Sequence, residues 1–163
     1  MSDQITLALD ASTKCVGFSL WSGYDYLSGF ERKYKGQAYL RMDRIARDVL
    51  DLCQEHLVQH VAIEKPVYVQ GHGHDTHFEL ACAFGAIASR VAGAGLHVYE
   101  INPKSAKAAL VSGKATKAQM IQAAQLYVGA RMVVGEHHAD SIGVFLAWWN
   151  SHGHRLQVES MRA

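Results

Sequence analysis

Residues 5–21 constrain the fold more than any other stretch, because they have the pattern of two strands joined by a tight turn. Apolar residues alternate with a period of two on both sides of the turn, as Ile5, Leu7 and Leu9 and then as Val16, Phe18 and Leu20. This period is typical of a β-hairpin. Asp10 lies at the bend, and the small residues 11–13 leave the backbone open to a polyanion or a metal. The alternative is that Asp10 merely caps the turn. A second acid that the fold could bring near Asp10 would favour a functional site instead.

Composition limits the class of protein. The chain has 163 residues, 49% hydrophobic and 19% charged, which is enough apolar material for one domain. We expect that domain in residues 1–150 and a polar, frayed tail in 151–163. Three widely spaced cysteines and no secretory leader favour the reduced cytoplasm of a bacterium or a phage-infected host. No apolar run approaches the ~20 residues of a membrane span, and a net charge of +1 gives no argument for nucleic acid.

The order of elements predicts an α/β fold. Residues 26–33 follow the hairpin as a third strand, so the sheet begins as an antiparallel meander. Residues 38–55 have apolar positions spaced by three and four, which indicates a helix lying on the sheet. Strands at 60–64 and 96–101, with a helix at 78–94 between them, predict a mixed five-stranded sheet with helices on both faces.

Glu64 is the second acid. It ends a short buried strand, because Pro66 cannot continue the hydrogen-bonded ladder. The following residues, 66–77, lack periodicity and are expected to form a loop. Three histidines and an aspartate make a zinc site conceivable there, namely His72, His74, His77 and Asp75. Their spacing matches no structural zinc pattern, so a surface loop that touches the substrate is the better interpretation.

Two further features concern partners. The predicted helix 78–94 has a face of small residues, namely Ala81, Gly85, Ala88 and Ala92, which can pack on a neighbouring helix or on a second copy of the chain. Four lysines, Lys104, Lys107, Lys114 and Lys117, form the one strongly basic run, around two helix starts at Asn102-Pro103 and Thr116 to Gln119. This run is either a solvated surface or a set of phosphate contacts.

The last helix starts near His137 and runs through Trp149. His137 and Asp140 are three residues apart and share a face, whereas His138 points away from Asp140. Asp10, Glu64, His137 and Asp140 then become candidate ligands of one site. Oxygen ligands with one imidazole suit Mg²⁺ or Mn²⁺. Two such ions ~3.5–4 Å apart would clamp a phosphodiester for hydrolysis, while the lysines would hold the backbone.

These residues resemble the RuvC-type Holliday junction resolvases, which have a ribonuclease H-like fold. The resemblance covers residues 4–150 and rests on Leu-Ala-Leu-Asp10-Ala-Ser with Gly17, on Val-Ala-Ile-Glu64, and on His137-His-Ala-Asp140-Ser-Ile. A small phage-encoded member would fit. Gly113-Lys-Ala-Thr-Lys117-Ala-Gln also looks like the basic turn of the family.

The resemblance implies a homodimeric endodeoxyribonuclease that binds two Mg²⁺ ions per site, accepts Mn²⁺, and resolves four-way junctions or other branched DNA by paired nicks. Asp10, Glu64, His137 and Asp140 match its metal ligands, and Lys107 and Lys117 match the lysines that contact DNA at its site, Lys107 among the catalytic residues. The family often has a wedging aromatic residue after the glutamate. Here Val67 has that spacing and Tyr68 follows it, so Tyr68 is a candidate DNA contact.

Other interpretations remain. A broader branched-DNA or flap nuclease of the same fold would carry the same site. Actin-like ATPases and sugar kinases also begin with a strand that ends in Asp, but they need two such lobes and have no use for His137 and Asp140. A catalytically silent DNA-binding domain would not need four candidate metal ligands. The sequence does not indicate a preferred cleavage sequence or a partner helicase.

Overall fold

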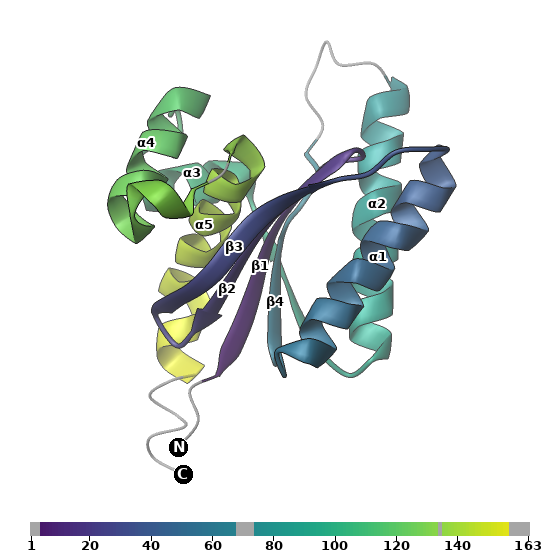
Figure 1. Ribbon diagram of the computed structural model, residues 1–163, viewed down its shortest axis with the longest axis horizontal. Coiled ribbons are helices and arrows are strands. Elements are labelled where there is room, and N and C mark those ends of the chain that lie inside the picture. Colours follow the sequence, from purple (N-terminus) through teal and green to yellow (C-terminus); the bar gives the residue numbers. More distant parts are fainter. Residues whose placement is uncertain (1–3, 68–73, 134, 157–163) are drawn as a thin grey trace.

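The fold is a mixed five-stranded sheet between two layers of helices (Figure 1). The computed structural model describes residues 4–67, 74–133 and 135–156. In the sheet order β3-β2-β1-β4-β5, the strands are β1 (Ile5–Ala11), β2 (Cys15–Ser22), β3 (Asp25–Lys33), β4 (His60–Glu64) and β5 (His97–Ile101). The first three form the predicted antiparallel meander, and β4 and β5 continue parallel to β1. The predicted fold class is confirmed.

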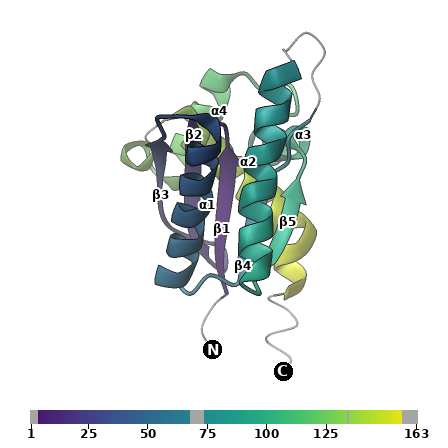
Figure 2. The same cartoon turned by 90° about the vertical axis from the view of Figure 1, so that its right-hand side faces the viewer.

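The helices divide between the two faces. α1 (Ala38–Glu55) and α2 (His74–Gly93) lie side by side over one face (Figure 2). The other face carries α3 (Pro103–Leu110), α4 (Lys117–Val128) and α5 (Glu136–Trp148), with a 3₁₀ turn, η1 (Ala130–Met132), after α4. None of the described helices is long and apolar enough to cross a membrane.

Strand alternation builds a separate core on each face. Leu7 and Leu9 of β1 pack with Phe18 of β2 beneath α1 and α2. Ala8 and Trp21 face the other way and pack with α5. Asp10 has the same parity as Ala8, so its side chain belongs to the face that α5 covers.

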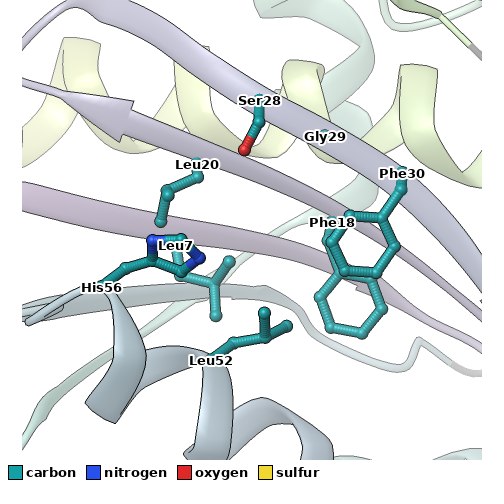
Figure 3. A pocket seen from close by; sticks show the side chains of 8 residues that line it. All are labelled: Leu7, Phe18, Leu20, Ser28, Gly29, Phe30, Leu52 and His56. Atoms are coloured by element: carbon teal, nitrogen blue, oxygen red, sulfur yellow. The ribbon is translucent and has the colours of Figure 1, made fainter.

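The core under α1 is nearly closed. Between β2, β3 and the last turn of α1 there remains a hollow of about 10 Å³, lined mainly by apolar side chains with His56 at one side (Figure 3). This volume is about that of a single water probe. The contact of the last turn of α1 with β2 and β3 therefore serves packing.

Two predicted helix starts are confirmed in detail. The Asn102 side chain accepts a hydrogen bond from the Lys104 backbone N–H, with Pro103 in the first turn. Thr116 and Gln119 form the reciprocal capping box that begins α4. These caps fix where α3 and α4 begin, and with them the backbone positions of the basic run.

Two predicted boundaries are wrong. α2 begins at His74 rather than at Phe78, so the expected loop 66–77 ends earlier. Its first turn is mostly exposed, with Phe78 70% exposed, and therefore shows no apolar period; Asp75 stabilises this end of the helix dipole. At the other terminus, α5 continues into a π-helical turn, η2 (Trp149–Gly153), and helical backbone extends to residue 156. The expected frayed tail from 151 thus starts as helix.

Candidate active site

The ends of β1 and β4 bring the two predicted acids together. The two strands are parallel, and Leu9 pairs with Ile63, so the next residues, Asp10 and Glu64, end neighbouring strands at the same edge. Both acids line one groove at this edge. The arrangement follows from topology, because parallel neighbours present their carboxyl ends together.

His137 of α5 contacts Asp10 directly. Its Nδ1 lies 2.6 Å from Asp10 Oδ2, and the two side chains are 29% and 13% exposed. The hydrogen bond to Asp10 raises the pKa of His137, against the opposing effect of burial. Because a carboxylate can only accept, His137 Nδ1 is the donor in this hydrogen bond, and Nε2 is the nitrogen whose lone pair could bind a metal once it is deprotonated.

Asp140 and Glu64 are half-buried acids in the same electrostatic environment. Burial above all, together with the nearby charges of Asp10 and Glu136, raises the pKa of Asp140 to about 7. Burial, then Asp10 and Asp140, also raises the pKa of Glu64. Lys107 and His137 lower both pKa values, but burial and the neighbouring acids prevail. The site thus combines three acids and one imidazole from β1, β4 and α5, and the nearby positive charges do not balance the acids.

A divalent cation fits this set of donors. Carboxylate oxygens with one imidazole are ligands that Mg²⁺ and Mn²⁺ accept, and a cation would favour the ionised form of each buried acid. Across residues 4–67, 74–133 and 135–156, however, no three His, Cys, Asp or Glu side chains already stand as a metal-holding group. The donors are neighbours that interact, with the Asp10–His137 hydrogen bond occupying part of the space between them.

The start of α5 is fixed from the strands. In α5 itself the N-cap is Gly135, which provides no side-chain cap. Instead Glu31 Oε1 of β3 accepts a hydrogen bond from the His138 backbone N–H at 3.2 Å. Gly17 is the sheet partner of both Asp10 and Glu31, and a β-carbon there would lie 1.9 Å from the His137 carbonyl oxygen. The bare backbone of Gly17 therefore lets α5 approach the sheet next to Asp10.

The neighbouring histidine has a different environment. His138 is fully buried, and its Nε2 lies 3.0 Å from the Tyr26 hydroxyl. Burial lowers the pKa of His138. Consecutive residues of a helix point about 100° apart, so His137 reaches Asp10 while His138 packs on β3. The structure places His137, and not His138, with the acids.

The predicted lysines surround the site unequally. Lys107, half-buried on α3, acts electrostatically on both Glu64 and Asp140. Lys117 begins α4, and its Nζ lies 2.5 Å from Glu136 Oε1 at the start of α5. Lys104 and Lys114 are exposed. Of the four lysines, Lys107 is thus the one that lowers the pKa values of Glu64 and Asp140.

Some residues near the site were missed, and some predicted ones lie outside the described residues. Glu31 and Glu136 were not singled out from the sequence; the register Asp10–Gly17–Glu31 across three strands is the signal that could have found Glu31. Tyr68 and His72 lie outside the described residues, as does the side chain of His74. Val67 is described and is 37% exposed.

The fold and the acids define a class of protein. A 3-2-1-4-5 mixed sheet with acids at the ends of β1 and β4, and at the start of the last helix, is a ribonuclease H-like arrangement. The family model described as crossover junction endodeoxyribonuclease RuvC matches residues 25–147. The chain belongs to the RuvC family, and it is an endodeoxyribonuclease, a hydrolase of phosphodiester bonds.

Solved structures agree in fold. RuvC of Thermus thermophilus in complex with Holliday junction substrate is 20% identical, with a TM-score of 0.75, and the match covers 92% of this chain and 97% of that one. The yeast mitochondrial Holliday junction resolvase is 11% identical, with a TM-score of 0.66, and the match covers 99% of this chain and 85% of that one. No curated protein sequence matches this chain. The kinase-like and silent-domain interpretations are therefore set aside.

Proposed function

We propose that this protein is a divalent-metal-dependent, structure-selective endonuclease that resolves four-way DNA junctions by paired symmetric nicks. The contact that carries the proposal is His137 with Asp10, because it joins the start of α5 to the strand ends that bear the acids. Family membership supports the reaction, and the junction named for the Thermus thermophilus structure supports the substrate.

In this proposal Asp10, Glu64, His137 and Asp140 hold the metal. Mg²⁺, with Mn²⁺ as a substitute and two ions per site, would activate water and neutralise charge at the scissile phosphate. Glu64 and Asp140 contribute half-buried carboxyl groups whose pKa values are raised by burial and by the neighbouring acids, so a bound cation would favour their ionised forms. His137 contributes Nε2, with Asp10 orienting the ring through Nδ1.

The lysines hold the DNA. Lys107 is near enough to the acids to influence them, so it can contact the phosphate at the cleavage point and is proposed as a catalytic residue. Lys104, Lys114 and Lys117 extend the positive surface over α3 and the start of α4. Lys117 must exchange its partner Glu136 for a phosphate, so its net contribution is smaller. Tyr68 remains a proposed DNA contact.

Paired nicks require two sites, and therefore a homodimer. The inward face of α2 carries Ala83, Ile87 and Val91, all fully buried. On the opposite face Ala81, Gly85 and Ala92 are exposed, and space is open at Gly85. A helix with small exposed residues permits close approach of a second copy, which supports a twofold dimer. We place the reaction in the cytoplasm.

The decisive experiment is a cleavage assay. Labelled four-way junction, flap and linear duplex are incubated with Mg²⁺, with Mn²⁺ or with EDTA, and the products are mapped on both strands. Metal-dependent symmetric nicks in the junction support the proposal. Equal cutting of linear duplex leaves a metal nuclease and removes the resolvase assignment, and cutting of flaps at the junction rate favours the broader branched-DNA nuclease. Sedimentation at micromolar concentration tests the dimer.

The phosphate contacts have their own test. Removing one lysine that contacts phosphate weakens binding to all sequences and lowers the salt slope by about one. We expect this result for Lys107→Ala and a smaller loss for Lys117→Ala. Lys35→Ala, at an exposed position before α1, is the control. Unchanged junction affinity and cleavage in both variants would place the DNA path elsewhere.

A further inference from the structure

Arg41 is a buried cation to which the proposed mechanism gives no role. It lies near the start of α1, and its side chain is only 9% exposed. Arg32, Arg47 and Arg90 also form ion pairs, but their side chains are 38–64% exposed. Burial disfavours a charge, and the positive end of the α1 dipole disfavours a cation in particular. Stability alone therefore does not explain an arginine at this position.

The guanidinium group of Arg41 joins three segments of the chain. Nε donates a hydrogen bond of 2.8 Å to the carbonyl oxygen of Thr13, in the turn between β1 and β2. Nη1 donates to the carbonyl oxygen of Gly36, which precedes α1, and Nη2 lies 3.4 Å from Glu79 Oε2 of α2. A planar fork of fixed donors suits three separate acceptors, which the compact ammonium group of a lysine cannot reach together.

The turn between β1 and β2 is directly connected to Asp10. The ladder between β1 and β4 ends one residue before Asp10 and Glu64. Asp10 is instead paired with Gly17 of β2, inside the hairpin. The turn itself is closed by hydrogen bonds of 2.7 and 3.0 Å between the Ser12 hydroxyl and the backbone of Cys15. The position of Asp10 relative to Glu64 therefore depends on how this closed end of the hairpin is held.

The end of the hairpin is held from both helical layers. From the α5 layer, His137 Nδ1 lies 2.6 Å from Asp10 Oδ2. From the α1 layer, Arg41 holds the backbone of Thr13, three residues beyond Asp10. The Arg41 contact is made to a backbone carbonyl, so it constrains the path of the chain itself. The same guanidinium group also contacts Glu79, so it fixes the turn relative to α2 as well as to α1.

We propose that Arg41 is a positioning residue of the nuclease, which fixes the turn after β1 and thereby holds Asp10 where it meets His137 and Glu64. Arg41 acts through the backbone and touches neither the DNA nor the metal. Its effect on metal binding rests on the proposed function. Groups that orient metal ligands from outside typically contribute roughly 10–100-fold in metal affinity or activity. The buried charge is then explained by the geometry that it imposes on Asp10.

The test makes the same substitution at two ion pairs between α1 and α2. Arg41→Lys keeps the charge but loses the fork. The matched control is Arg90→Lys, in the last turn of α2, where Arg90 Nη2 lies 3.2 Å from Asp43 Oδ1 of α1. Calorimetry measures Mg²⁺ binding by the DNA-free protein, and NMR records the imidazole signals of His137 in EDTA at one fixed pH. Thermal melting verifies folding, and Arg41→Gln, which buries no charge, replaces Arg41→Lys if that variant does not fold.

We expect Arg41→Lys to bind Mg²⁺ about tenfold more weakly, to need about tenfold more Mg²⁺ for half-maximal cleavage, and to shift the His137 signals. Its affinity for junctions in EDTA should equal that of the wild type, and Arg90→Lys should match the wild type in every one of these measurements. Unchanged Mg²⁺ binding and His137 signals in folded Arg41→Lys, or equal changes in Arg90→Lys, overturn the inference, while cleavage by the wild type upholds the proposed function. A wild type that binds no Mg²⁺ and cuts no junction overturns the proposed function, and the His137 signals still decide whether Arg41 positions Asp10.

Discussion

A β-carbon at Gly17 would lie 1.9 Å from the carbonyl oxygen of His137 and 2.6 Å from the backbone nitrogen of His138. Both atoms that this β-carbon would meet belong to the backbone of α5, so no side-chain rotation can relieve the clash. α5 thus reaches Asp10 only because β2 carries no side chain opposite it.

Gly17→Ala is therefore expected to push the start of α5 away from the sheet. The Asp10–His137 contact should be lost, cleavage should fall by more than about 100-fold, and the free energy of unfolding should fall by about 1–3 kcal/mol. Cleavage kinetics and denaturant unfolding measure the two effects. Gly93→Ala is the control, since nothing lies within 4 Å of its β-carbon position. A variant that cuts like the wild type would show that α5 need not dock so closely.

The two adjacent histidines should separate activity from stability. We expect His137→Ala to cut at least about 100-fold more slowly while binding junctions and unfolding normally, and His137→Asp to retain much of the activity. From the sequence alone, His138→Ala would be mild. Because His138 is buried against Tyr26, we now expect it to lower the free energy of unfolding by about 2–4 kcal/mol, with cleavage largely retained well below its melting temperature.

Both readouts are needed for each variant, namely single-turnover cleavage and the urea midpoint. If His138→Ala is inactive while fully folded and His137→Ala is active, the ligand has been assigned to the wrong histidine.

Asp140 should make the metal-free protein sensitive to alkaline pH. Its pKa is raised to about 7, from 3.8, chiefly by burial, so the native state binds the proton more tightly than the unfolded state. The stabilising contribution is complete below about pH 4 and is lost as pH rises through about 7. In EDTA at pH 8, Asp140→Asn should therefore be more stable than the wild type by about 2 kcal/mol.

Melting temperatures between pH 5 and 8 measure this effect, with Asp51→Asn on the exposed side of α1 as the control. Adding Mg²⁺ or Mn²⁺ at pH 8 should stabilise the wild type and have little effect on Asp140→Asn. An identical pH dependence of the two proteins in EDTA would mean that Asp140 is not a destabilising charge.

Glu31 should act through its hydrogen bond to the start of α5. Glu31→Ala removes the acceptor for the His138 N–H and is expected to cost about 1 kcal/mol, as for the loss of a helix cap, and to slow cleavage several-fold. Glu31→Gln keeps an acceptor oxygen, so it should restore most of the rate and stability. The metal concentration at half-maximal rate should move with Glu31→Ala and return with Glu31→Gln. Equal losses of rate and stability in Glu31→Ala and Glu31→Gln would assign the effect to the negative charge of Glu31. The control is Glu55→Ala, at an exposed position at the end of α1.

The sequence by itself determined the elements whose signals are local. The period of two in residues 5–20 and the period near 3.6 in residues 38–55 predicted β1, β2 and α1, because burial of one face selects apolar residues at that spacing. The caps at Asn102 and Thr116 were readable for the same reason, since a helix start is satisfied by side chains within three residues. Asp10 and Glu64 were singled out because each ends such a strand.

Only the tertiary structure decided which distant groups meet, because their contacts depend on the register between strands and on the docking of α5. The backing of α5 by Glu31 joins residues 107 apart, and no local pattern marks it. The first turn of α2 was missed because it is mostly exposed, and an exposed turn does not select apolar residues at helical spacing. The groove walled by Asp10, Glu64 and Phe84 exists only where β1, β4 and α2 come together, so its chemistry became visible with the fold.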